Sequence, residues 1–302
     1  MIGMERDFVL LGVPSSAGAY GPGQEKAPQA LREAGLVELL RGSGRHVIDA
    51  GDLSPVRFTA DDEHPHERSL SAVIEVVRTT AQRTRGLVSS GSKLILIGGD
   101  CTITLGVVAG MLGVDPRLRL AYLDGDVDLE TPETTPSGIF DGMVVAHLLG
   151  LGSPRLSRVG PRVPLLNEED IALFGYNDQS EWFVAPEREM LTHLRSPTFP
   201  CRRISPNPSA VAAEALGALR PTGRRLLVHF DTDVMDAEDF PAAELSHRGG
   251  LSWDQTMQCL RVFVRDPSFD GLVVTEFNPD KDPTGRHALR LANGLAEALA
   301  MT

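Results

Sequence analysis

The sequence predicts an α/β fold with three layers (α/β/α), in which helices cover both faces of a mainly parallel sheet. Short runs of consecutive apolar residues recur along the chain, as expected for strands that are buried on both faces. Helical patterns alternate with these runs, which favours βαβ units, and three of the runs end in acidic residues. No repeat or long biased linker interrupts the pattern, so we expect residues 1–302 to form one domain.

The first part of the chain contains two predicted strands and two predicted helices. The apolar run at residues 8–13 predicts the first strand, and a helical period over residues 28–40, with a proline in its first turn, predicts one helix. We predict a short strand at residues 47–50 and a long helix at residues 69–90. The segment between them, residues 52–66, is polar and acidic and is expected to lie on the surface.

The centre of the predicted sheet comes from three runs that are apolar almost throughout, at residues 94–97, 120–123 and 226–230. Runs of this composition are typical of strands that are covered on both faces. The remaining predicted elements are two strands, at residues 171–174 and 272–275, and four helices, at residues 102–112, 142–149, 252–264 and 286–300.

Charge and composition exclude several classes of partner. The chain has 29 basic and 41 acidic residues, a formal net charge of -12, and no cluster of Lys and Arg that could bind phosphate. We therefore expect no nucleic-acid partner and no docking on an anionic membrane surface. No apolar run is long enough to cross a membrane, and the charged start, residues 1–7, does not resemble a signal peptide. With three cysteines in no disulfide spacing, we expect a reduced cytoplasmic protein.

Acidic residues directly follow three of the predicted strands. Ligands of open parallel sheets lie beyond the carboxyl ends of the strands, so these segments should converge on one crevice. Carboxylates gathered there repel one another, which either raises their pKa values or favours bound divalent cations, and oxygen ligands suit Mg²⁺, Mn²⁺ and Ca²⁺. One isolated Asp would be more simply a helix cap or a loop residue, but three matching clusters favour a metal site. The segments are Gly98-Gly99-Asp100-Cys101, Asp124-Gly125-Asp126-Val127-Asp128 and Asp231-Thr232-Asp233.

Together with other parts of the chain, these segments resemble the ureohydrolases, the family of arginase, agmatinase and formimidoylglutamase. Residues 10–14 and 27–36 resemble the opening strand and helix of that family, residues 131–143 its substrate loop, and residues 276–279 its guanidinium-binding segment. The resemblance implies an arginase-like fold, a homo-oligomer (a trimer or a hexamer), a small guanidino substrate, and two manganese ions held by two His and four Asp. The four Asp positions are Asp124, Asp128, Asp231 and Asp233 here.

Four positions depart from the pattern of the family. Cys101 and Asp126 stand where the family has its two histidine ligands. Asp141 stands in place of its proton-shuttling histidine, and Glu130 in place of an asparagine that binds the amino-acid end of arginine. If Cys101 and Asp126 are also ligands, five aspartates and a thiolate would leave two dications with a net charge of -2, so we expect a retained proton or fewer ions. A cysteine ligand suits Zn²⁺ or Fe²⁺ better than Mn²⁺, and it also resembles the hydroxyarginine-cleaving branch of the family.

The same resemblance implies roles for three further residues. Glu276 would pair with the cationic guanidinium or amidine group of the substrate. Ser137 would contact a substrate carboxylate, although a Ser-Gly pair is equally typical of an ordinary turn. Asp178 lies where the family binds the amino group of its substrate. His147 and His229, each beside an apolar run, are expected to pack or cap locally rather than to bind metal.

The leading interpretation is a metal-dependent amidinohydrolase that cleaves a linear C–N bond in a guanidino or amidino compound. Asp126 and Asp141 would act beside the metal, with Asp141 as a proton relay, and Glu276 would hold the substrate cation. The alternative is a catalytically inactive ureohydrolase scaffold with a binding, regulatory or structural role, because three histidines of the family are absent together. A nucleotide-binding oxidoreductase is excluded because the chain has no G-x-G-x-x-G fingerprint.

Overall fold

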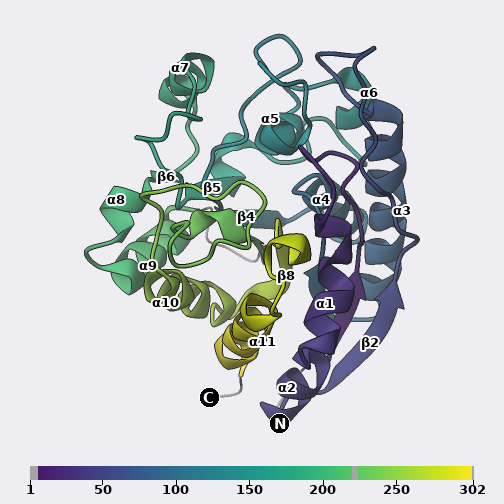
Figure 1. Ribbon diagram of the computed structural model, residues 1–302, viewed down its shortest axis with the longest axis vertical. Helices are drawn as coiled ribbons and strands as arrows, with labels where there is room; N and C mark the ends of the chain where they lie inside the picture. The colour runs from purple at the N-terminus through teal and green to yellow at the C-terminus, as the bar shows by residue number, and fades with distance from the viewer. Residues whose placement is uncertain (1–5, 220–223, 301–302) are drawn as a thin grey trace.

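The computed structural model describes residues 6–219 and 224–300 and contains one eight-stranded sheet, in which all the strands are parallel (Figure 1). The strand order is β2-β1-β3-β8-β7-β4-β5-β6. Residues 1–5, which are most of the charged N-terminal segment that does not resemble a signal peptide, lie outside the described residues. The strands are β1 (Phe8–Gly12), β2 (Val47–Asp52), β3 (Lys93–Ile97), β4 (Leu118–Leu123), β5 (Ile171–Phe174), β6 (Thr198–Phe199), β7 (Arg225–Asp231) and β8 (Phe269–Thr275).

Helices cover both faces of this sheet, as the sequence predicts. Helices α1, α2, α9, α10 and α11 pack on one face, and helices α3, α4 and α5 pack on the other (Figure 1). The α-helices are α1 (Ala27–Glu33), α2 (Leu36–Gly42), α3 (Leu70–Ser89), α4 (Ile103–Leu112), α5 (Val144–Leu148), α6 (Pro154–Ser157), α7 (Ala185–His193), α8 (Cys201–Ile204), α9 (Pro208–Ala218), α10 (Trp253–Val264) and α11 (Arg286–Leu299). Short 3-10 helices are η1 (Gln24–Lys26), η2 (Asp141–Met143), η3 (Glu168–Asp170), η4 (Thr232–Val234) and η5 (Pro279–Lys281).

The continuous apolar runs are explained by burial on both sides of the sheet. In β3, Ile95 and Ile97 belong to the core under one helix layer, whereas Leu94 and Leu96 belong to the core under the other. Successive side chains of a strand point to opposite faces, so a strand between two helix layers needs apolar residues at every position. The predicted three-layer α/β/α class with a parallel sheet is confirmed.

The prediction of one helix over residues 28–40 is wrong. The chain forms α1 and α2 instead, separated by Gly35, whose φ of 84° interrupts the helix. The predicted helix at residues 142–149 begins as the 3-10 helix η2 and continues as the short helix α5. The sequence also gave no indication of β6 or of helices α6 to α9.

The strand register brings the predicted acidic segments to one edge of the sheet. Ile97 at the end of β3 pairs with Val274 of β8, Thr275 of β8 with Asp231 of β7, and Phe230 of β7 with Leu123 of β4. Four neighbouring central strands therefore end together, and the residues that follow them share one crevice. Within the described ranges, no helix has both the length and the apolar character that would let it cross a bilayer.

Candidate metal centre

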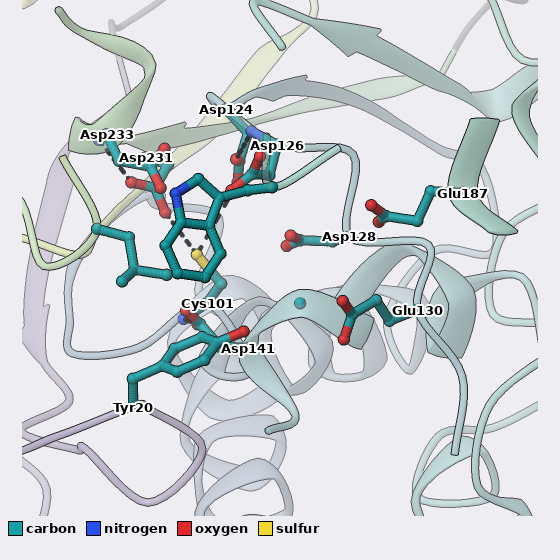
Figure 2. Close-up of a pocket in the computed structure, with 13 residues that line it drawn as sticks. Tyr20, Cys101, Asp124, Asp126, Asp128, Glu130, Asp141, Glu187, Asp231 and Asp233 are labelled. Atoms are coloured by element: carbon teal, nitrogen blue, oxygen red, sulfur yellow. Dashed lines mark hydrogen bonds between the residues drawn. The ribbon is translucent and has the colours of Figure 1, made fainter. Parts of the chain in front are cut away.

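A cavity of about 40 Å³ lies at this edge of the sheet, and acidic side chains dominate its lining (Figure 2). Eight of the thirteen lining residues carry a carboxylate. No lysine or arginine is among the described residues that line it. The lining residues are Tyr20, Cys101, Asp124, Asp126, Asp128, Glu130, Asp141, Gly142, Trp182, Glu187, Asp231, Asp233 and Leu245.

Backbone N–H groups hold the outer oxygens of the central carboxylates. The N–H of Asp126 donates to Asp124 Oδ1 at 2.7 Å, and the N–H of Asp233 donates to Asp231 Oδ1 at 2.7 Å. The N–H of Gly125 donates to Asp233 Oδ1 at 3.0 Å. These bonds form because the chain turns sharply where β4 and β7 end, and Asp231 is the N-cap of η4. In all three carboxylates the other oxygen, Oδ2, lies near a sulfur or nitrogen atom that could also bind a cation.

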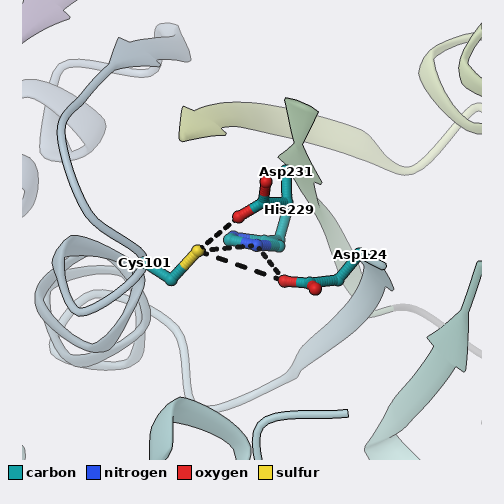
Figure 3. Close-up of side chains that lie close together, drawn as sticks. All are labelled: Cys101, Asp124, His229 and Asp231. Atoms are coloured by element: carbon teal, nitrogen blue, oxygen red, sulfur yellow. Dashed lines mark hydrogen bonds and ion pairs between the residues drawn. The ribbon is translucent and has the colours of Figure 1, made fainter. Parts of the chain in front are cut away.

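One group of potential ligand atoms surrounds the sulfur of Cys101 (Figure 3). Cys101 Sγ lies 2.6 Å from Asp231 Oδ2 and 4.0 Å from Asp124 Oδ2. His229 Nε2 lies 3.2 Å from Asp124 Oδ2 and 3.6 Å from the sulfur. All four residues are buried, and their ligand atoms lie within 4.8 Å of one another. Such a set offers one sulfur, one nitrogen and two oxygens to a cation.

A second group consists of Asp126, Asp233 and His247, whose ligand atoms also lie within 4.8 Å of one another. His247 Nε2 is 3.1 Å from Asp126 Oδ2 and 3.8 Å from Asp233 Oδ2. The histidine is carried by the loop between η4 and α10, where the N–H of Ala237 donates to its carbonyl at 2.8 Å. A bridge between Met235 and Leu251 closes the base of this loop. His247 therefore approaches Asp126 and Asp233 from a segment that carries no recognised motif.

Asp128 lines the cavity but belongs to neither group of ligand atoms found among the described residues. Its carboxylate accepts a hydrogen bond from the Tyr122 hydroxyl, and its backbone has a φ of 51°. The Tyr122 ring in turn stacks on His229, with centroids 4.0 Å apart. The hydrogen bond from Tyr122 thus holds the Asp128 carboxylate in place in the cavity lining.

Asp141 and Glu276 lie beside Cys101, and the ligand atoms of all three lie within 4.8 Å of one another. The N–H of Cys101 donates to Asp141 Oδ1 at 2.8 Å. Glu276 Oε2 accepts a hydrogen bond from Gln24 Nε2 at 3.1 Å, whereas the buried Oε1 has no hydrogen-bond partner in the described part of the chain. Glu276 also has a φ of 62°, a conformation that costs free energy in a non-glycine residue and that the surrounding packing must maintain.

The pKa values of three central carboxyl groups, of the Cys101 thiol and of His247 are all raised above their ordinary values. Burial, with the neighbouring charge of Asp126 in addition, raises the pKa of Asp124 to about 8. Burial and mutual repulsion also raise the pKa values of Asp231, Asp233 and the Cys101 thiol well above their ordinary values. Burial alone would lower the pKa of His247, but the adjacent carboxylates, Asp126 first among them, raise it to about 9. A cluster of this kind holds protons when it holds no metal, and a divalent cation would replace them.

The structure brings most of the predicted site residues together. The six predicted ligands (Cys101, Asp124, Asp126, Asp128, Asp231 and Asp233) line the cavity with Asp141 and Glu130. Glu276 lies behind that lining, next to Cys101 and Asp141.

Two further predicted substrate-binding residues, Ser137 and Asp178, also lie outside the cavity lining. Asp178 pairs with Arg202, whose Nε is 2.7 Å from Asp178 Oδ2. Ser137 lines a neighbouring cavity of about 250 Å³, where its Oγ is 3.3 Å from the Tyr20 hydroxyl. Glu130 accepts a hydrogen bond from the Thr135 hydroxyl at 2.6 Å, which fixes its carboxylate at the rim.

Sequence reasoning missed His247 and Glu187, and it expected His229 only to pack locally. The His229 ring does pack on Tyr122, but its Nε2 also faces the carboxylates. A signal for this was present, because His229 and Asp231 are two positions apart on one strand and so point to the same side. Glu187, on α7, accepts a hydrogen bond from the Leu129 N–H at 3.1 Å, and burial raises its pKa to about 8. No local pattern marks His247 or Glu187.

Comparison with known proteins places these features in a family. The family model described as the arginase family matches residues 6–302. Similar curated proteins include the arginase of Brevibacillus brevis, 28% identical over 92% of this chain and 93% of that protein, and arginase-1 of Rattus norvegicus, 29% identical over 97% and 90%. Among solved structures, the arginase of Bacillus caldovelox superposes with a TM-score of 0.87 at 23% identity, covering 99% of both chains. The agmatine ureohydrolase of Thermoplasma volcanium superposes with a TM-score of 0.68 at 18% identity, covering 98% and 89%.

Proposed function

The chain belongs to the arginase family, and from this premise we propose that it is a metal-dependent amidinohydrolase that cleaves a linear C–N bond in a guanidino or amidino compound. Hydrolases of this family act on C–N bonds other than peptide bonds. One observation carries the proposal. Carboxylate oxygens and a sulfur converge in one buried cavity, next to a glutamate oxygen that has no hydrogen-bond partner.

The residues of the cavity fit a divalent cation. Backbone N–H groups donate hydrogen bonds to Asp124, Asp231 and Asp233 and so orient these carboxylates, as the groups around a metal site do for its ligands. Cys101, Asp124, Asp126, Asp128, Asp231 and Asp233 would hold one or two ions, with Mn²⁺ favoured by the family and Zn²⁺ or Fe²⁺ by the sulfur. A bound divalent cation supplies a water molecule whose pKa is low enough for it to act as a nucleophile near neutral pH.

Side chains in and beside the cavity would bind the substrate, donate a proton and exclude water. Glu276 Oε1, which is buried and unpartnered, would accept a charge-assisted hydrogen bond from the guanidinium and hold its central carbon toward the carboxylate cluster. Burial raises the pKa of Asp141 well above its ordinary value, so this side chain can keep a proton and give it to the leaving amine. Tyr20 and Trp182 contribute aromatic surface to the lining and would exclude bulk water from the site.

The charge of the rim limits the class of substrate. Glu130 and Glu187 both line the cavity, and no basic residue is among its described lining residues. A carboxylate on the substrate would find no cation there and would be repelled by Glu130 where that side chain is ionised, whereas an amine or a neutral group would not be repelled. We therefore expect guanidino amines and neutral guanidino compounds to be better substrates than guanidino acids. With Glu130→Asn, the ratio of kcat/KM for guanidino acids to that for guanidino amines should rise about tenfold or more, since removing a like charge is worth ~1–2 kcal/mol.

The decisive experiment combines metal analysis with turnover. The purified protein is loaded separately with Mn²⁺, Zn²⁺ and Fe²⁺, its metal content is measured, and urea and amine release are followed over a panel of guanidino and amidino compounds. Asp231→Asn serves as the inactive control, because it removes a central carboxylate from the cluster. A metal-loaded sample that turns over no member of the panel contradicts the proposal.

The alternative is an inactive member of the family with a binding, regulatory or structural role. It is favoured by the simultaneous replacement of three family histidines, at Cys101, Asp126 and Asp141. The double change Cys101→His with Asp126→His distinguishes the inactive protein from the active hydrolase. It should create activity if the natural protein is an inactive scaffold, and it should abolish activity if the natural protein is an adapted enzyme. The homo-oligomer expected from the family, a trimer or a hexamer, is a further proposal that analytical ultracentrifugation would test.

A further inference from the structure

Two histidines reach the carboxylate cluster from positions at which the family motifs have no ligand. The family's own histidine positions are occupied by Cys101 and Asp126. The two additional histidines come from elsewhere, His229 from the middle of β7 and His247 from the loop before α10. One histidine belongs to each of the two main groups of ligand atoms described above.

His229 is held as a metal-binding histidine is held. Its Nδ1 lies 2.8 Å from the Thr104 hydroxyl, its ring stacks on Tyr122 at an interplanar angle of 4°, and the residue is fully buried. Contacts on one ring nitrogen and on the ring face fix the direction of the other nitrogen. That other nitrogen, Nε2, faces Asp124 Oδ2 at 3.2 Å and the Cys101 sulfur at 3.6 Å (Figure 3).

The Nε2 atom of His247 is buried and makes no hydrogen bond to any residue that the structure describes. The side chain is 4% exposed, and Asp126 Oδ2, although only 3.1 Å away, does not have hydrogen-bond geometry. Two atoms that bind the same ion at about 2.0–2.2 Å lie roughly 3.0–3.4 Å apart, and they point at the ion instead of at each other. The separation between His247 and Asp126, and their lack of mutual alignment, match that arrangement.

We propose that His229 and His247 replace the lost family histidines in space and supply one nitrogen ligand to each of two cation positions. Cys101, Asp124, His229 and Asp231 hold one ion, and Asp126, Asp233 and His247 hold the other. This proposal rests on the metal dependence of the proposed function, but not on catalysis. It also names the class of ion, because a mixed set of sulfur, nitrogen and oxygen ligands selects Zn²⁺ or Fe²⁺ over Mg²⁺ or Ca²⁺.

The test measures zinc binding in His229→Gln, in His247→Gln and in a control, His193→Gln, which removes an exposed histidine on α7. Stoichiometry comes from elemental analysis after dialysis against Zn²⁺, and affinity from competition with a chromophoric chelator. The wild type and the control should bind two ions per chain. Each of the other variants should lose one ion or bind it more than about tenfold more weakly.

Cobalt substitution assigns the two positions separately. The Co²⁺–thiolate absorption band should persist in His247→Gln, which leaves the Cys101 group intact, and should be lost or shifted in His229→Gln. Because His229 is fully buried and its replacement could prevent folding, X-ray absorption of the zinc-loaded wild type provides a second measurement. That spectrum should contain imidazole scattering equivalent to one histidine per zinc ion.

Two results would overturn the inference: zinc binding that neither substitution weakens, or a zinc spectrum without imidazole scattering. A histidine that served only as a counter-cation for the carboxylates would give the first result. Failure of the proposed function is distinguishable from both. Zinc-loaded protein with one imidazole per ion and no turnover contradicts the hydrolase proposal alone, and an active protein whose metals depend on neither histidine contradicts this inference alone.

Discussion

Glu276 shows how one side chain can be prepared for a ligand before that ligand arrives. It has an unfavourable backbone conformation, one carboxylate oxygen bonded to Gln24, and the other oxygen buried without a partner. An unsatisfied buried carboxylate costs free energy, so a structure that retains one usually does so for function. Burial and the nearby charge of Asp141 raise the pKa of Glu276 well above its ordinary value, and a cationic substrate would reverse that shift.

The change Glu276→Gln should separate substrate binding from folding. The amide keeps the shape and can still bond to Gln24, but it cannot supply a negative charge to a guanidinium. We expect kcat/KM to fall about 10- to 100-fold, because a hydrogen bond to a charged group is worth ~1.5–3 kcal/mol. The free energy of unfolding should stay level or rise by about 1 kcal/mol, since a buried carboxylate is removed. Steady-state kinetics and urea denaturation measure both quantities.

The control is Glu38→Gln, which makes the same chemical change at an exposed residue of α2, outside the cavity lining. It should leave both kcat/KM and the free energy of unfolding unaltered. An unchanged kcat/KM in the Glu276 variant would contradict the proposed role of this residue in substrate binding.

At the scale of elements, the turn after β4 depends on a close approach that only glycine permits. A Cβ added to Gly125 would lie 2.7 Å from the carbonyl oxygen of Asp233 and 2.9 Å from its Oδ1. The same glycine donates its N–H to that carboxylate. The turns after β4 and β7 are therefore in direct contact, and the turn after β4 fixes the carboxylate of Asp233.

Gly125→Ala should accordingly force the two turns apart. We expect a loss of about 1–3 kcal/mol in unfolding free energy, typical of overpacking at a site that cannot relax, together with weaker metal binding. The matched control is Gly217→Ala in α9, where an added Cβ meets no atom of the described residues within 4 Å. That change should stabilise the protein by up to ~1 kcal/mol through helix propensity. Equal stability of the two variants, measured by chemical denaturation, would contradict this account of the turn.

The elements that could be predicted from the sequence are those whose pattern has one physical cause. The central parts of strands such as β3 and β7 are mainly apolar because helices cover both their faces. Helix α7 was missed because Glu187 is its one buried residue, so it has no apolar stripe to recognise. The break at Gly35 was missed because the apolar period continues across it.

The same reasoning limits the prediction of the site. Asp124 and Asp231 could be placed together because the carboxyl ends of neighbouring parallel strands coincide. His247 could not be placed, because a loop brings it back over the sheet edge and local sequence does not encode that path. Ser137 and Asp178 were placed by resemblance, and the structure leaves both outside the cavity lining.

At the scale of the whole molecule, the cavity should make stability depend on pH and metal together. A carboxyl whose pKa is higher in the folded chain keeps its proton while the unfolded chain loses it, so stability falls as the pH rises. For Asp124, with a folded pKa of about 8, this loss runs from about pH 4 to about pH 8. His247, raised to about 9, contributes stability below about pH 6.5 that is lost as the pH rises through 9.

Both contributions have the same sign, so the metal-free protein should become steadily less stable between about pH 5 and about pH 9. Excess Zn²⁺ or Mn²⁺ should reverse most of that loss, because the cation replaces the protons. Differential scanning calorimetry with and without a chelator tests this. In Asp124→Asn the free energy of unfolding of the metal-free protein should fall less steeply with pH. The difference in slope should be up to about 1.4 kcal/mol per pH unit, which is the contribution of one proton. A metal-free melting temperature that rises over this range would contradict the assignment.

The contact between Asp126 and His247 has a consequence for natural variation. If the imidazole at 247 compensates for its absence at 126, the two positions should coevolve. Relatives with histidine at the position of Asp126 should have a small or apolar residue at the position of His247, and relatives with aspartate at the first should tend to keep histidine at the second. A survey of divergent arginase-family genomes would reveal that correlation, and statistical independence of the two columns would count against the exchange.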